Sequence, residues 1–160
     1  MVKESPLKDK VVLAVDDEPD VIETLRDELD ICKVVGKTSY EDAVKYIEKN
    51  TPDLAILDIM GVNGLELLKL CAENNIPAVM LTANAFTVET LKKSIDLGAK
   101  AFFPKEKIGE LRGFLEQVMD KSKKQAWEQL FERLGEFFNA TFGSDWKKDL
   151  IETGPFIVPE

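Results

Sequence analysis

The stretch Val-Val-Leu-Ala-Val-Asp-Asp-Glu-Pro, residues 11–19, decides the fold because it joins an apolar run to two acids and the start of a helix. Its first five residues are continuously apolar rather than alternating, which is typical of a strand in a parallel sheet that is covered on both faces. Pro19 suits the first turn of a helix. The stretch is therefore predicted to form a strand and a helix that meet at Asp16 and Asp17.

Similar units recur along the first hundred residues. The predicted strands are Val11 to Val15, Lys33 to Val35, Leu54 to Ile59, Ala78 to Leu81 and Ala101 to Phe103. Between them, apolar residues recur at the spacing of a helix. Five such repeats, joined by right-handed crossovers, predict an α/β fold with a doubly wound five-stranded parallel sheet and helices on both faces.

Composition excludes several classes of function. The 160 residues include 30 acidic and 21 basic ones, so the net charge is -9 and we expect no nucleic-acid partner and no membrane contact. Histidine is absent, so a metal must be held by oxygen ligands. The charged N-terminus and the lack of a long apolar run predict a cytoplasmic protein.

Polar residues lie at the carboxyl ends of the predicted strands, where ligands bind in such sheets. The first strand ends in Asp16 and Asp17, the third in Asp58 and the fourth in Thr82, and the fifth leads through Pro104 into Lys105. Each residue alone is more typical of a solvated turn or a helix cap, but their co-location indicates a site. Three nearby carboxylates are costly unless a cation neutralises them, and Mg2+ suits an all-oxygen site. Asp58 is then the candidate nucleophile toward phosphorus, with Thr82 and Lys105 to hold phosphoryl oxygens.

These motifs resemble the receiver domain of two-component response regulators, in a stand-alone form like the chemotaxis regulators. The matching text is Val-Val-Leu-Ala-Val-Asp-Asp-Glu-Pro at 11–19, Leu-Ala-Ile-Leu-Asp-Ile at 54–59, Gly-Leu-Glu-Leu-Leu at 64–68, Pro-Ala-Val-Met-Leu-Thr-Ala at 77–83 and Gly-Ala-Lys-Ala-Phe-Phe-Pro-Lys at 98–105. The resemblance covers residues 8 to about 120. It implies a flavodoxin-like sheet with strand order 2-1-3-4-5 and a role in a bacterial phosphorelay.

The resemblance also implies roles for the acids. Asp58 matches the residue that accepts a phosphoryl group from a sensor histidine kinase or a histidine phosphotransfer protein. Asp16 and Asp17 match the Mg2+ ligands, together with Asp58 and the backbone carbonyl of Met60. The chain is then a signalling protein that only phosphorylates and dephosphorylates itself on Asp58, and it is not expected to be a turnover enzyme.

Three further positions match the part of the family that senses the phosphoryl group. Thr82 and Lys105 match its hydroxyl residue and its lysine, and Phe102 matches its aromatic switch residue. In the family, phosphorylation turns this aromatic inward and remodels the face of the fourth helix, fifth strand and fifth helix, which implies signalling by protein contact. The alternative for Phe102 is a core aromatic that does not move.

The sequence departs from the family pattern at two places. The loop after Asp58 reads Ile-Met-Gly-Val-Asn-Gly, which lacks the usual Met-Pro and is about two residues shorter than the common form. Lys105 is followed by Glu106 instead of proline. A non-proline cis peptide costs roughly 3 kcal/mol, so a trans peptide is expected there. Neither departure removes a side chain of the site.

Residues 121–160 are predicted to be a helical extension of a receiver domain that spans residues 1–120. The extension holds seven of the 13 aromatic residues, and its apolar residues recur at helical spacing up to a stop at Gly143. The candidate partner face consists of Trp127, Phe131, Leu134 and Phe138. Three interpretations remain open: packing on the receiver, docking of a partner helix, and pairing with a second copy, for which the helix 4 to helix 5 face is the other candidate. Residues 154–159 are predicted to form an extended end.

The extension is shorter and less basic than a DNA-binding output domain, which argues against a transcription factor. Its basic cluster, Lys121, Lys123 and Lys124, is more typical of a solvated hinge.

Two other functions remain open. A degenerate receiver would bind partners without phosphorylation, as the altered loop after Asp58 suggests. A phosphatase with an aspartyl nucleophile would resemble Asp-x-Asp after the first strand, whereas this chain has Asp16-Asp17-Glu18 there.

Overall fold

The computed structural model describes residues 4–83 and 87–143 of the chain. Its five-stranded sheet is parallel and has the order β2-β1-β3-β4-β5. The strands are β1 (Val11–Val15), β2 (Lys33–Lys37), β3 (Leu54–Asp58), β4 (Ala78–Thr82) and β5 (Ala101–Pro104). The predicted fold class and strand order are confirmed.

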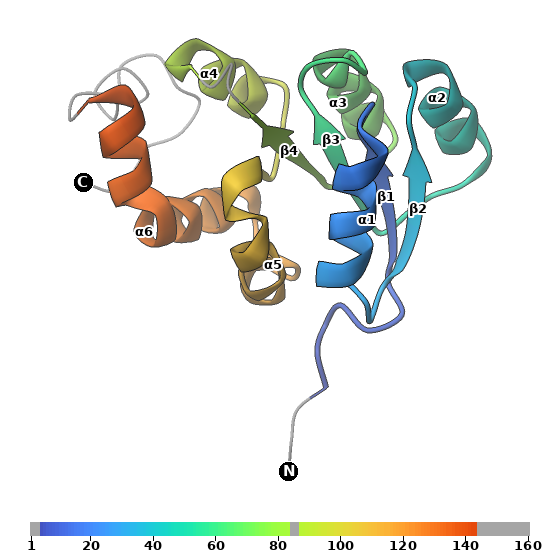
Figure 1. Ribbon diagram of the computed structural model, residues 1–160, viewed down its shortest axis with the longest axis horizontal. Helices are drawn as coiled ribbons and strands as arrows, with labels where there is room; N and C mark the ends of the chain where they lie inside the picture. Colours follow the sequence, from blue (N-terminus) through green and yellow to red (C-terminus); the bar gives the residue numbers. More distant parts are fainter. Residues whose placement is uncertain (1–3, 84–86, 144–160) are drawn as a thin grey trace.

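Helices cover both faces of this sheet. They are α1 (Pro19–Glu28), α2 (Tyr40–Lys49), α3 (Gly64–Glu73), α4 (Val88–Asp96), α5 (Leu111–Val118) and α6 (Lys123–Phe142), and a short 3-10 helix, η1 (Lys105–Glu110), leads from β5 into α5. α1 and α5 lie on one face, and α2, α3 and α4 lie on the other (Figure 1). No helix within residues 4–83 and 87–143 is long and apolar enough to cross a membrane.

The two edges of the sheet differ in burial. β2 is half-exposed, as an edge strand commonly is, whereas every residue of β5 at the opposite edge is buried. The cause is α6, which contacts both β5 and α5 and lies at the end of the sheet farthest from β2 (Figure 1). An added helix of this kind protects an edge strand from pairing with other chains.

The side chains predicted to form a partner face lie inside the protein. Trp127, Phe131, Leu134 and Phe138 are each at most 4% exposed. The indole N–H of Trp127 donates a hydrogen bond to the carbonyl of Ala99 at 2.9 Å. The sequence left three interpretations open for this helix. The structure shows the first of them, in which the helix packs on its own receiver domain. Partners reach these side chains only if α6 moves away, and their role as a partner face stays a prediction.

The C-terminal boundary of α6 agrees with the sequence pattern. The helix ends at Phe142, and Gly143 follows it with φ of +84°, a conformation in which glycine has no steric penalty. The predicted extended end, residues 154–159, lies outside the described residues.

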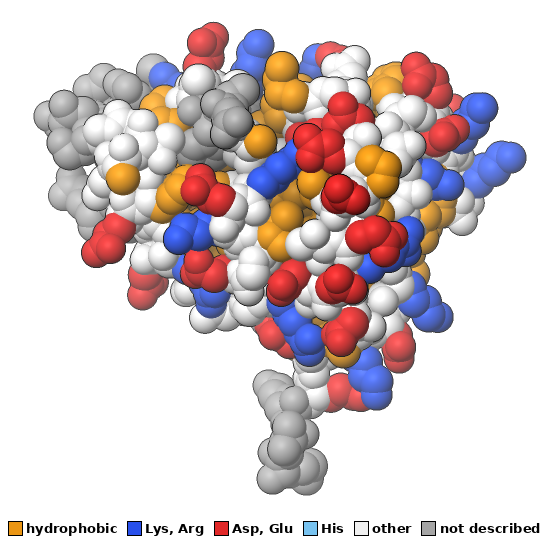
Figure 2. All heavy atoms as spheres, viewed as in Figure 1, with side chains coloured by type: hydrophobic (Ala, Val, Ile, Leu, Met, Phe, Trp, Pro, Cys, Tyr) orange, Lys and Arg blue, Asp and Glu red, His pale blue; other side chains and the backbone are white. Residues whose placement is uncertain are grey.

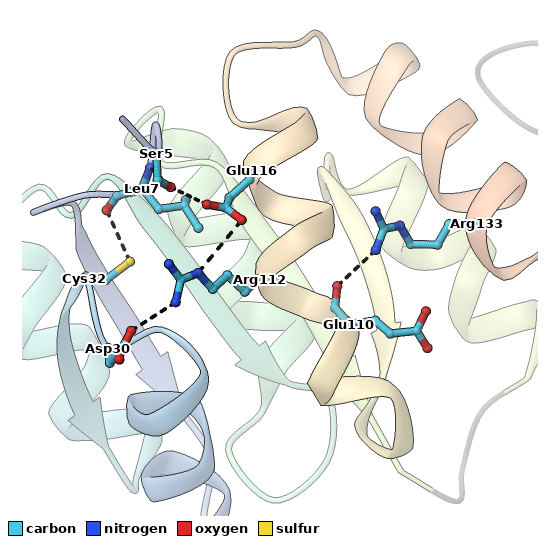
Figure 3. Close-up of polar contacts among 8 residues, drawn as sticks. All are labelled: Ser5, Leu7, Asp30, Cys32, Glu110, Arg112, Glu116 and Arg133. Carbon is cyan, nitrogen blue, oxygen red and sulfur yellow. Dashed lines mark hydrogen bonds and ion pairs between the residues drawn. The ribbon is translucent and has the colours of Figure 1, made fainter. Parts of the chain in front are cut away.

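Polar contacts hold α5 to its neighbours on two sides (Figure 3). Arg112 of α5 pairs with Asp30 after α1 at 3.1 Å and with Glu116 at 3.9 Å. Arg133 of α6 donates to the carbonyl of Glu110 at 3.4 Å. Exposed ion pairs of this kind contribute little individually, so the buried apolar face of α6 supplies most of its docking energy.

Truncation of Trp127 tests how firmly α6 is docked. We expect Trp127→Ala to lower the free energy of unfolding by about 3–5 kcal/mol, because it leaves a cavity and an unpaired carbonyl at Ala99. Denaturant titration followed by circular dichroism measures the change. Glu132→Ala, at an exposed position of the same helix, is the control and should stay within about 0.5 kcal/mol of the wild type. Equal effects of the two substitutions would contradict the packing of α6 on the receiver.

Candidate functional site

The strand ends bring the predicted site residues to one edge of the sheet. Asp16 directly follows β1, Asp58 ends β3 and Thr82 ends β4. Asp58 lies opposite Leu81 in β4, and Thr82 lies opposite Pro104 in β5. Lys105 is the next residue after Pro104, so it lies just beyond the end of β5. The parallel register therefore places an acid, a hydroxyl and a lysine on neighbouring strands, as the sequence predicts.

Three carboxylates meet at this edge. Asp16, Asp17 and Asp58 each offer an oxygen, and these oxygens all lie within 4.8 Å of one another. Asp16 and Asp58 are buried, with 1% and 5% exposure, whereas Asp17 is exposed. Acidic side chains also gather over neighbouring α1 on the face shown in Figure 2. The edge is strongly negative.

Lys105 is the cation that partly balances these charges. Its Nζ lies 2.9 Å from Asp16 Oδ2 and 3.4 Å from Asp58 Oδ1. Burial lowers the pKa of Lys105, but its contacts with Asp16 and Asp58 outweigh that effect and raise the pKa. The lysine therefore stays charged at neutral pH, which is what a partner for phosphoryl oxygens requires.

Asp58 differs from an ordinary aspartate in its proton affinity. Burial and the neighbouring charge of Asp16 raise its pKa from 3.8 to about 6, although Lys105 opposes the rise. At neutral pH the carboxylate is ionised but poorly solvated and crowded by like charge. It is therefore both available as a nucleophile and favoured by any cation that enters the site.

The residues at this edge fit a hard divalent cation. Asp16 Oδ1 accepts a hydrogen bond from the backbone N–H of Glu18 at 2.9 Å, and the buried Asp16 Oδ2 pairs with Lys105 Nζ at 2.9 Å. Carboxylate oxygens are the donors that Mg2+ prefers. A cavity of about 180 Å3 opens beside them, lined by Asp17, Glu18, Asp58, Met60, Gly61, Ala83 and Lys105.

The loop after Asp58 is shaped by two glycines. Gly61 has φ of +82°, and a Cβ at this position would lie 2.5 Å from Asp17 Oδ2. A Cβ at Gly64 would lie 2.1 Å from the carbonyl oxygen of Asp58. The short loop therefore folds tightly over the acids and leaves the Met60 side chain 61% exposed beside the cavity.

Sequence reasoning missed some of these residues. Glu18 and Gly61 line the cavity, although the motif comparison assigned them no role. A glycine three residues after Asp58 was the available signal, since a residue that approaches a carboxylate this closely cannot carry a side chain.

The predicted switch residues lie in the two strands that follow β3 in the sheet, Thr82 at the end of β4 and Phe102 within β5. Thr82 is 2% exposed, and no hydrogen bond joins it to the carboxylates in the described part of the chain. Phe102 is fully buried in β5. The described residues contain no cis peptide, so the Lys105–Glu106 peptide is trans, as predicted. The switching roles of Thr82 and Phe102 stay predictions.

Comparisons with known proteins agree with this geometry. A family model for the response regulator receiver domain matches residues 12–116. This chain belongs to that receiver family. The receiver is similar to the DNA-binding response regulator MtrA of Mycolicibacterium smegmatis, with 34% identity over 122 residues that cover 69% of this chain and 52% of MtrA. It is also similar to the response regulator GtcR of Aneurinibacillus migulanus, with 31% identity over 69% of this chain and 50% of GtcR.

A solved structure supports the same fold. The receiver matches a response regulator from Thermotoga maritima with a TM-score of 0.63 and 18% identity, over 71% of this chain and 99% of that one. By contrast, the chain spans about half the length of the curated relatives named above.

The expectation that nucleic acid is excluded was wrong. MtrA is named a DNA-binding response regulator, and the receiver resembles it despite a net charge of -9. The physical reason is that net charge describes the long-range field of this chain alone. It carries no information on which partners a relative binds.

The pKa of Asp58 gives a pH-dependent prediction for the metal-free protein. Above about pH 6 the folded state holds Asp58 ionised at a cost that the unfolded chain does not have, and this cost is lost progressively as the pH falls from about 6 to 3.8. We therefore expect Asp58→Asn to stabilise the protein by about 1–3 kcal/mol at pH 7.5 and by about half as much at pH 5. Thermal melts in EDTA measure this difference.

The matched control for this prediction is Asp27→Asn, which removes one charge from an exposed position on α1. This control should change the melting temperature little at either pH. A destabilised Asp58→Asn protein at pH 7.5, or a gain that is independent of pH, would contradict the raised pKa.

Proposed function

We propose that this receiver accepts a phosphoryl group on Asp58 from a sensor histidine kinase or a histidine phosphotransfer protein. The observation that carries the proposal is the contact of Lys105 with both Asp16 and Asp58 in a cluster of three carboxylates. Such a cluster is costly for the protein, so its retention at one edge of the sheet favours a chemical role over a structural one.

The transfer follows from the side chains present. A carboxylate oxygen of Asp58 attacks phosphorus, and the bond from phosphorus to the donor nitrogen breaks, with its electron pair staying on the imidazole. Lys105, already 3.4 Å from Asp58 Oδ1, pairs with a phosphoryl oxygen. Positioning and charge neutralisation are the main requirements of such a transfer.

Asp16, Asp17, Asp58 and the backbone carbonyl of Met60 would hold Mg2+. When bound, Mg2+ supplies positive charge that neutralises the carboxylates and the incoming phosphoryl oxygens. Asp16 would contribute a buried carboxylate to this role, and Asp17 an exposed one that Gly61 leaves room for.

Signalling then follows as a population shift. The phosphoryl group adds about two negative charges beside Lys105, and this stabilises the state in which Thr82 and Lys105 surround it. Phe102 and the α4, β5 and α5 surface would respond, and α6 already contacts β5 and α5. We propose no substrate turnover beyond self-phosphorylation and autodephosphorylation on Asp58, and a cytoplasmic location alongside the donor kinase.

Labelling with a small phosphodonor tests the proposal. Intact mass after incubation with Mg2+ and acetyl phosphate should increase by one phosphoryl group in the wild type and in Asp27→Ala. The increase should be absent in Asp58→Ala and without Mg2+. A wild type that stays unlabelled while another receiver is labelled would favour a degenerate binding module. Rapid turnover of a phosphomonoester would favour a phosphatase.

A second proposal concerns output. Because the relative MtrA is named DNA-binding, we include DNA among the candidate output partners of this receiver. Fluorescence anisotropy of labelled duplex DNA measures this, with protein that has or has not been treated with acetyl phosphate. Binding that changes at least tenfold on phosphorylation, and not in Asp58→Ala, supports DNA as an output. Anisotropy that stays flat to high protein concentration in both states would show that this chain does not contact DNA by itself.

A further inference from the structure

A second cavity lies at the opposite edge of the sheet from the acids. It has a volume of about 260 Å3 and is placed beside Pro77 before β4 and Lys100 before β5. Because the amino ends of parallel strands share one edge, this cavity is remote from Asp58. Its lining includes Lys100, Lys121 and Lys123 but no acidic residue.

Lys100 is a buried cation that forms no ion pair with a carboxylate in the described part of the chain. Lys100 is only 6% exposed. Its Nζ donates hydrogen bonds to the carbonyls of Met119 and Lys121, each at 3.0 Å. An ammonium has three donors, so one remains after these two bonds. Burial lowers the pKa of Lys100, and the charge of exposed Asp120 only opposes that effect. Buried lysines are rare unless they are paired.

Two further lysines join Lys100 at this cavity. Lys121 and Lys123 are exposed, and neither forms an ion pair within the described residues. A Cβ at Gly98 would lie 3.0 Å from Lys123 Nζ, so the glycine makes room for the ammonium. In a chain whose net charge is -9, three lysines in a cavity lining that contains no acid form a locally positive site.

The remaining lining is apolar or neutral. Ala72, Ile76 and Pro77 border the same cavity, and Asn75 adds an amide. Lysine ammoniums act as point charges for phosphate oxygens, and an apolar border accommodates a small organic group. The lining therefore combines recognition of charge with room for a carbon skeleton.

We propose that this cavity binds a small phosphate monoester, with its phosphate held by Lys100, Lys121 and Lys123. The ligand supplies the counter-charge that the buried ammonium lacks. Since Lys100 also bonds to the carbonyls that join α5 to α6, an occupied site would stabilise the docking of α6.

Phenyl phosphate is a suitable probe because it carries both the charge and an apolar ring. Titration in EDTA at constant ionic strength, followed by amide chemical shifts, excludes Mg2+-dependent binding at the acidic edge. We expect saturable shifts at Gly98, Lys100 and Lys121. The double variant Lys121→Ala with Lys123→Ala should bind at least tenfold more weakly and keep the dispersed spectrum of a folded protein.

The matched control removes the same charge from another surface. Lys45→Ala with Lys49→Ala, on exposed positions of α2, should change the affinity by less than twofold. Non-saturable shifts in the wild type, or equal weakening in both double variants, would overturn the proposal, because the attraction would then be general to basic surfaces.

Discussion

Repulsion among Asp16, Asp17 and Asp58 is the constraint on which the rest of the molecule depends. Three carboxylates with oxygens within 4.8 Å of one another oppose folding unless something holds them in place. β1 and β3 hold them, since these strands are adjacent and almost wholly buried on both faces. Lys105 offsets part of the remaining charge. The apolar core thus provides the rigidity, and the strand ends provide the chemistry.

β5 is flanked by a lysine at each end. Lys105 lies beyond its carboxyl end among the acids, and Lys100 lies before its amino end under the junction of α5 and α6. The strand is at the edge of the sheet, yet it is fully buried because α6 covers it. The packing of α6 therefore completes the receiver core in this chain.

The parts of this architecture that follow from local rules could be predicted from the sequence. Continuous apolar runs identify buried parallel strands, and the strand order then brings Asp16, Asp58 and Lys105 to one edge. The stripe that includes Trp127 and Phe138 predicts an apolar face, but the periodicity does not say what covers that face. Lys100 was not recognised, because a lysine before a strand has no pattern that distinguishes a buried ammonium from a solvated one.

The distance between Lys100 and Lys105, which flank β5, also limits the electrostatic coupling between the two ends of the strands. The four residues of β5 separate the two lysines, so five residue-to-residue steps of roughly 3.3 Å place them about 16 Å apart. This separation exceeds the Debye length of about 8 Å at physiological ionic strength, so direct charge coupling through solvent between the edges is weak. Influence of the acidic edge on α6 therefore passes mainly through packing, either along β5 or through η1 and α5. A fully buried strand with rigid neighbours is suited to that, because a close-packed core has low compressibility and transmits strain.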